Sequence, residues 1–197
     1  MALPFFYILF ILIEKLNDKI YSKKRKFKQY GVFVFRNFIP ENAQKLKDTS
    51  IQFVESVKSN NFQNAQRVSD EASNILMNLV IDIRKGQDNG EFSDFDICDK
   101  NTSYYIKNIN SVNKTVEDIW VDFKNNPNNI DYSVSQNLTI RRFANVNAHG
   151  DYVGYYIDNN DNHWLCFKNK PSNPSNNAIE LIIVNIQKVC DYIITNI

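Results

Sequence analysis

The stretch QNLTIRRFANVNAHGDYVGYY, residues 136–156, determines how the rest of this chain is interpreted. Apolar and polar residues alternate over Leu138–Phe143, which predicts a strand. The run Tyr152–Ile157 is aromatic and β-branched, which predicts a second strand. Between them stands the triplet His149-Gly150-Asp151. Alternate residues of a strand point to one side, so His149 Nε2 and a carboxylate oxygen of Asp151 can converge on one metal ion.

Helical periodicity dominates the residues upstream of this stretch. Apolar residues recur at helical spacing over residues 41–58 and again over residues 64–85, and Gly86 is expected to end the second helix. A third helix is predicted over residues 112–123, and the run Tyr104–Ile106 predicts a short strand.

Downstream of the same stretch, the polar run Asp158–Asn162 predicts a turn, and Trp164–Phe167 is apolar again. A hairpin centred near residue 160 would place His163 opposite Ile157. Residues 179–197 are apolar and β-branched, which suits either a strand or a helix. Helices that precede strands are typical of an α+β protein.

The composition is that of a folded globular protein, with 43% hydrophobic and 23% charged residues among 197. A net charge of +1 gives no electrostatic basis for binding nucleic acid. The cysteines are odd in number and widely spaced, and no CxxC occurs, which indicates free buried thiols. They are Cys98, Cys166 and Cys190.

Residues 1–26 combine the apolar run Leu3–Ile13 with the basic stretch Lys23–Lys26. The apolar run is shorter than the roughly 20 residues that a membrane-spanning helix needs. We expect either a helix that packs on the protein or an anchor at a membrane surface, so the chain is cytoplasmic or membrane-attached. Three glycosylation patterns leave a secreted glycoprotein as a further alternative. They begin at Asn101, Asn113 and Asn137.

Two separated units carry a family resemblance. Gly31, the apolar run Val32–Phe35 and the residues Arg36–Ile39 form a G-(hydrophobic strand)-R-N-F-I phrase that precedes a predicted helix. Residues 136–156 then supply a strand, a turn and an H-x-D-x-x-Y-Y unit. In this order, over residues 27–156, the two units resemble the phytanoyl-CoA dioxygenase-like group of Fe(II)/2-oxoglutarate-dependent dioxygenases.

The resemblance implies N-terminal helices packed on a double-stranded β-helix, the jelly roll. It implies that His149 and Asp151 are two Fe(II) ligands and that 2-oxoglutarate is the co-substrate of a hydroxylation. From their position in the unit, Tyr152 and Tyr155 are expected to line the co-substrate pocket. The substrate would be a small molecule.

The chain departs from the family pattern after Asp151. The family's third ligand is a His on a later strand, followed by an Arg or Lys that binds 2-oxoglutarate. His163 stands too close to Asp151 for that role, and no Arg follows Arg142. We therefore expect residues 27–197 to form an incomplete, truncated jelly roll without activity. His163 either completes the site by another route or is a loop histidine beside a core Trp.

The alternative is a non-catalytic α+β protein that acts through contacts or lies at a membrane surface through residues 1–26. The sequence specifies neither a substrate nor an oligomeric state.

Overall fold

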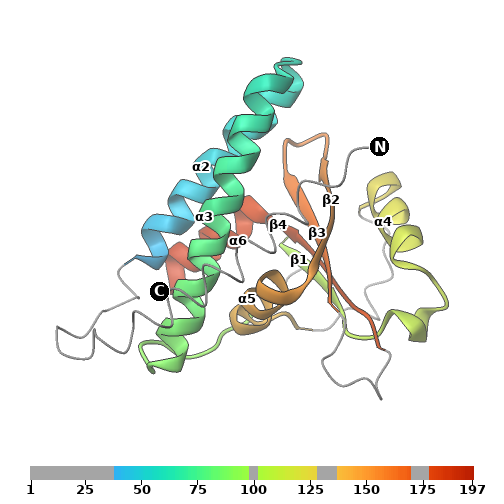
Figure 1. Ribbon diagram of the computed structural model, residues 1–197. Helices are drawn as coiled ribbons and strands as arrows, with labels where there is room; N and C mark the ends of the chain where they lie inside the picture. The colour runs from blue at the N-terminus through green and yellow to red at the C-terminus, as the bar shows by residue number, and fades with distance from the viewer. Residues whose placement is uncertain (1–37, 98–101, 128–136, 170–177) are drawn as a thin grey trace. The chain divides into compact units, whose positions relative to one another are not determined.

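The computed structural model describes residues 38–97, 102–127, 137–169 and 178–197, all within one compact unit that spans Val34–Ile197 (Figure 1). The expected strand Val32–Phe35, the N-terminal segment 1–26 and Cys98 lie outside the described residues. None of the described helices is long and apolar enough to cross a bilayer.

Two long helices form a hairpin, α2 (Ile39–Lys58) and α3 (Phe62–Asp88). Helix α2 begins with a proline in its first turn, and the Asn61 side chain caps α3 by accepting a hydrogen bond from the Asn64 N–H. The expected end of the second helix at Gly86 is wrong. Gly86 is buried inside α3, where an added Cβ would lie 2.6 Å from the Phe92 ring, so it is a packing residue.

The predicted third helix is confirmed as the 3₁₀ turn η2 (Ile109–Val112) followed by α4 (Val116–Asn125). A capping box fixes the start of α4. The Thr115 hydroxyl accepts from the Asp118 N–H, and the Asp118 carboxylate accepts from the Thr115 N–H.

The strand expected over Leu138–Phe143 is wrong, because these residues begin the helix α5 (Ile140–His149). The Thr139 side chain accepts a hydrogen bond from the Arg142 N–H and so caps this helix. Three fully buried residues follow the i, i+3, i+4 spacing of a helix face, and they are Ile140, Phe143 and Ala144.

The described strands form one antiparallel sheet in the order β1-β4-β3-β2, which confirms the α+β class. The jelly roll stays a prediction, since four strands in one sheet do not make a double-stranded β-helix. The strands are β1 (Ser103–Ile106), β2 (Asp151–Ile157), β3 (His163–Asn169) and β4 (Glu180–Asn185).

The tail of the chain is both strand and helix, because β4 passes directly into α6 (Ile186–Asn196). Asn185 lies where the strand ends and the helix begins. Its side chain accepts a hydrogen bond from the Lys188 N–H and so caps α6. Cys166 and Cys190 are free and buried, as the sequence predicts for them.

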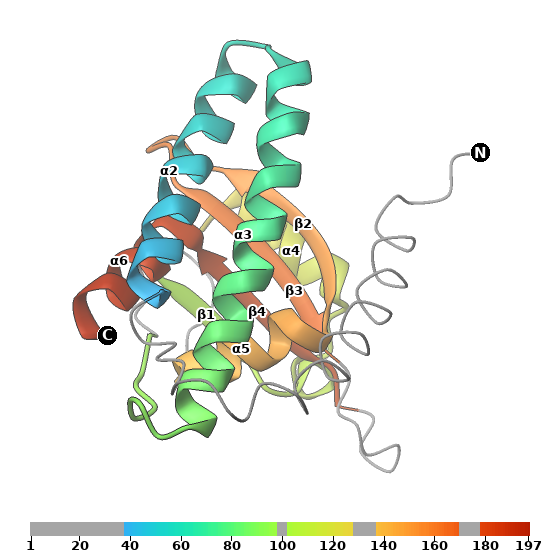
Figure 2. The same cartoon turned by 60° about the vertical axis from the view of Figure 1, so that its left-hand side comes forward.

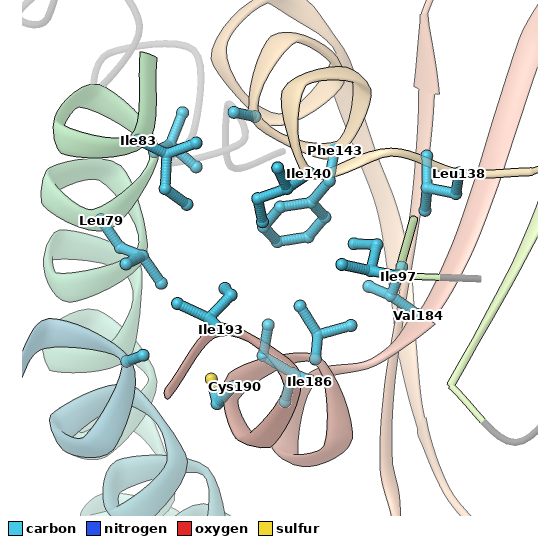
Figure 3. Packing of buried hydrophobic residues seen from close by; sticks show 14 of the residues in the cluster. Leu79, Ile83, Ile97, Leu138, Ile140, Phe143, Val184, Ile186, Cys190 and Ile193 are labelled. Atoms are coloured by element: carbon cyan, nitrogen blue, oxygen red, sulfur yellow. The ribbon is translucent and has the colours of Figure 1, made fainter. Parts of the chain in front are cut away.

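Helices cover both faces of the sheet (Figure 2). Ile182 and Val184 of β4 point into the main core, which four helices (α2, α3, α5 and α6) share with the sheet. Figure 3 shows Phe143 among these residues. The alternate residues Leu181 and Ile183 pack against α4 on the other face.

A third, small cluster lies at the far end of the α2–α3 hairpin. It contains three buried residues, with Val57 and Ile157 packed against them. We call it the distal cluster, and its buried members are Phe53, Ala65 and Val68.

Candidate binding site

His149 and Asp151 do not share a strand, because His149 is the last residue of α5 and Asp151 the first of β2. Both are exposed. The Arg84 guanidinium lies 3.2 Å from His149 Nε2. Because arginine can only donate, Nε2 accepts this hydrogen bond, and its lone pair is the one that a metal would need. Partial burial and then the Arg84 charge lower the pKa of His149.

The described residues contain no group of three His, Cys, Asp or Glu side chains placed to hold a metal ion. The geometric premise for His149 and Asp151, alternation along one strand, is wrong because α5 occupies the position of the expected strand. Their assignment as Fe(II) ligands, and 2-oxoglutarate as co-substrate, stay predictions.

Tyr152 and Tyr155 lie on the same face of the sheet although they are three residues apart. The register of β2 against β3 shifts between Tyr152 and Gly154, so the strand contains a bulge that restores their common side. The Tyr152 ring packs against Phe167 at 5.7 Å, and the Tyr155 ring packs against Phe53 at 5.1 Å. Both rings stay partly exposed, and their predicted role in a co-substrate pocket stays a prediction.

His163 pairs with Ile157 across the β2–β3 hairpin, as the sequence predicts. It is not a loop histidine, because it begins β3 and is buried beside Trp164. Its Nδ1 lies 2.9 Å from the Ser50 hydroxyl, and its ring stacks on Phe53 at 4.8 Å. Burial lowers the pKa of His163 to about 4.

The opposite end of the same hairpin carries Asp151, whose partner in the strand register is Lys168 of β3. Six residues of strand separate Ile157 from Asp151, or about 20 Å at 3.3 Å per residue. His163 therefore cannot complete a metal site with His149 and Asp151.

An open groove of about 720 Å³ runs along α2. One side of α2 forms one wall, and the β2–β3 turn and the first turns of α6 form the others. We call this groove the α2–α6 groove. The α2 wall extends from Lys47 to Ser59, about 18 Å at 1.5 Å per residue. The lining residues are Lys47, Ile51, Val54, Glu55, Lys58, Ser59, Asn160, Asp161, Asn162, Gln187, Lys188 and Asp191.

Ile51 is the apolar centre of the α2–α6 groove. The sequence places it on the apolar face of α2, where it would be buried, yet its side chain is 39% exposed. Val54, one turn further along, is buried. The sequence signal that could have identified the groove is the stripe of charged residues Lys47, Glu55 and Lys58 that flanks Ile51 at helical spacing.

Two ion pairs bound the groove. Lys47 reaches Asp191 of α6 at 2.6 Å near one end, and Lys58 reaches Asp161 of the β2–β3 turn at 2.8 Å near the other. Across the ranges that the structure describes, Glu55 makes no ion pair, and neither does Lys188 in α6. The groove thus presents one anion and one cation beside an apolar centre.

The β2–β3 turn, one wall of this groove, is closed by hydrogen bonds. The Asp158 carboxylate accepts hydrogen bonds from the Asn160 and Asn162 N–H groups and from Trp164 Nε1. Burial alone would raise the pKa of Asp158, but these hydrogen bonds outweigh it and lower the pKa. Asn185 Nδ2 donates to Asn162 Oδ1 at 2.9 Å and so ties the turn to the start of α6.

Comparison with protein-family models, with curated proteins and with solved structures finds no match for this chain. The resemblance over residues 27–156 therefore rests on the two sequence units alone.

Proposed function

We propose that this chain is a non-catalytic α+β binding module that holds a short segment of a partner protein in the α2–α6 groove. The observation that carries the proposal is the exposed Ile51 at the floor of a groove whose flanking Glu55 and Lys188 make no ion pair within the described residues. A complementary segment places an apolar side chain on Ile51, a basic one near Glu55 and an acidic one near Lys188.

The strength of such a contact follows from its size. Full burial of one aliphatic side chain contributes about 1.5–3 kcal/mol, and Ile51 is already more than half covered. The flanking charges lie near solvent, where an ion pair contributes about 0–1 kcal/mol. We therefore expect weak, reversible binding whose specificity comes from the order of charges along the segment.

Dioxygenase activity has less support from the geometry. Arg84 already occupies His149 Nε2, and the described residues supply no third ligand near Asp151. The groove, in contrast, is walled by elements that ion pairs and hydrogen bonds hold in place.

Selection of random displayed peptides against the full-length chain tests the proposal. We expect enriched peptides with an apolar residue between one acidic and one basic residue. Ile51→Asp should weaken their binding by at least about tenfold, or 1.4 kcal/mol. The matched control is Val121→Asp, at a residue of α4 that is 46% exposed on the other face of the sheet.

A charge reversal sharpens the result. Lys188→Glu should change the preferred acidic residue of the enriched peptides to a basic one. Peptides that bind the wild-type chain and the Ile51→Asp variant equally, or a selection that enriches no peptide, would overturn the proposal.

A further inference from the structure

We propose that a proton on His163 opens the α2–α6 groove, so that the groove holds its segment at neutral pH and releases it in acid. The release of a segment rests on the proposed function, but the opening of the groove is a property of the fold alone. His163 stands at the seam between two walls of the groove, α2 and the β2–β3 turn, which lie side by side (Figure 2).

The contact between Ser50 and His163 joins these two walls. The Ser50 hydroxyl lies 2.9 Å from His163 Nδ1, and both side chains are buried. Ile51, the apolar centre of the groove, follows Ser50 in the sequence. Asn162, which lines the turn wall, directly precedes His163. A change at this contact therefore acts on both walls of the groove.

Two neighbouring contacts show how much the seam depends on His163. The His163 ring stacks on Phe53 at 4.8 Å, and Phe53 belongs to the distal cluster. At the rim of the groove, the Lys58 ammonium lies 2.8 Å from both carboxylate oxygens of Asp161. Both side chains of this ion pair are more than half exposed, so it contributes little to stability. The buried histidine is therefore the stronger connection.

The elements around the His163 ring do not compensate a proton on it. Burial is the only cause that lowers the pKa of His163, so no charged group within the described residues offsets the cost of charging the ring. α2 presents Ser50 and Phe53 to the ring, and β2 presents Tyr155, whose ring lies 6.0 Å away. The charged side chains on this part of the surrounding elements are Lys47, Glu55 and Lys58 of α2, Arg67 and Glu71 of α3, Asp158 and Asp161 of the turn, and Lys188 and Asp191 of α6.

A proton on His163 therefore favours an open state, in which the far end of the hairpin leaves β3 and the ring reaches water. In that state the ring takes up a proton near its ordinary pKa of 6.5, whereas burial holds the pKa at about 4 in the closed state. The closed state keeps its full stability above pH 6.5 and loses stability as the pH falls to 4. Between pH 7 and pH 5, the ratio of open to closed chains rises about twentyfold.

Amide hydrogen exchange of the full-length chain at pH 7 and pH 5 tests the opening. After correction for the intrinsic effect of pH on exchange, we expect about twentyfold more opening over residues 50–58 and little change around Leu79. His163→Phe should remove this increase, and so should His163→Gln, which keeps a hydrogen-bond partner for Ser50. The matched control is His149→Gln, which removes the other histidine of the chain and should leave the increase intact.

A binding measurement tests whether opening releases a segment. The probe is a displayed peptide that the wild-type chain enriches at pH 7, and its affinity is measured again at pH 5. The apparent affinity falls in proportion to the closed fraction. We expect a loss of at least about threefold, which corresponds to about two thirds of the chains being open. His163→Phe should bind the peptide with nearly the same affinity at both pH values.

The outcomes separate this inference from the proposed function. Equal opening at the two pH values, or an increase that His163→Phe retains, would overturn the opening by a proton on His163. An opening that leaves the affinity for the peptide unchanged overturns the release in acid, although the groove still binds. If the selection enriches no peptide, the proposed function fails and the release fails with it, while hydrogen exchange still decides whether a proton opens the groove.

Discussion

The two ends of the α2–α3 hairpin are held in different ways. The end that contains Leu79 and Ile83 packs in the main core, to which four helices and three strands contribute. The far end has only the distal cluster, with three buried apolar residues. Since burial of apolar surface is the main stabilising term, the far end should open locally at a lower free energy than the whole domain.

The packing at the two ends of the hairpin also differs in polarity. Beside the distal cluster, the contact between α2 and β3 includes the buried pair Ser50 and His163, joined at 2.9 Å. A buried histidine must stay neutral, so this contact depends on pH in a way that the apolar main core does not. The far end of the hairpin is therefore the end whose stability should change with pH.

The largest expected effect comes from the main core. Phe143 is fully buried, and Phe143→Ala should lower the free energy of unfolding by about 3–5 kcal/mol, because it leaves a cavity. Chemical denaturation measures the loss. Val121→Ala, at an exposed position, should change stability by less than about 0.5 kcal/mol. A small loss for Phe143→Ala would mean that the main core is not the principal source of stability.

Acid should weaken the far end of the hairpin through His163. Burial holds the pKa of folded His163 at about 4, while the unfolded chain takes up this proton near the ordinary pKa of 6.5. Stability should therefore fall as the pH drops from 6.5 to 4 and lose nothing more from this group below 4. The full effect is about 3 kcal/mol.

A pair of variants isolates this effect from the titration of carboxylates. His163→Phe keeps a ring against Phe53 but cannot titrate, so its acid sensitivity over this range should be smaller. Ser50→Ala keeps the titrating ring and should retain the sensitivity. Equal pH profiles for His163→Phe and the wild-type chain would contradict the assignment.

A substitution with a smaller effect should show directly that the two ends of the hairpin differ in local stability. Val68 is fully buried in the distal cluster, and Val68→Ala removes two methyl groups, at a cost of about 1.5–2 kcal/mol. We expect faster amide hydrogen exchange over residues 62–68 and little change around Leu79. A uniform increase in exchange along α3 would show that the hairpin opens as one unit.

The smallest expected effect is that of metal. If the chain is a non-catalytic module, anaerobic Fe(II) or its redox-stable substitute Mn(II) should leave the melting temperature unchanged, with or without 2-oxoglutarate. Asp151→Ala should behave like the wild-type chain. A metal-dependent rise in melting temperature that disappears in Asp151→Ala would instead support the predicted iron site.

Much of the fold was predictable where one signal had no competitor. The apolar periodicity of residues 41–58 led to α2, and the polar run Asp158–Asn162 correctly located the hairpin and the pairing of His163 with Ile157. In these stretches, local propensity and tertiary packing favour the same structure.

The errors arose where two periodicities compete. Over Leu138–Phe143, alternation suggested a strand, but the Thr139 cap and the buried pair Phe143 and Ala144 follow the helical spacing that the structure adopts. The charged residues on α2 mark one wall of the α2–α6 groove, but the exposure of Ile51 was not predictable, because Ile51 falls among the apolar residues that recur along α2. Its exposure depends on where α6 and the β2–β3 turn lie, which is information from distant parts of the chain.

The strand order also fixes a sequence of events during synthesis. β2 and β3 are joined by a short turn and can pair as soon as both have left the ribosome. β1 is translated earlier, yet its partner is β4, with Ser103 opposite Val184. A nascent chain must therefore keep the apolar residues of β1 from other contacts until β4 emerges, so chaperone binding during translation should concentrate on residues 103–106.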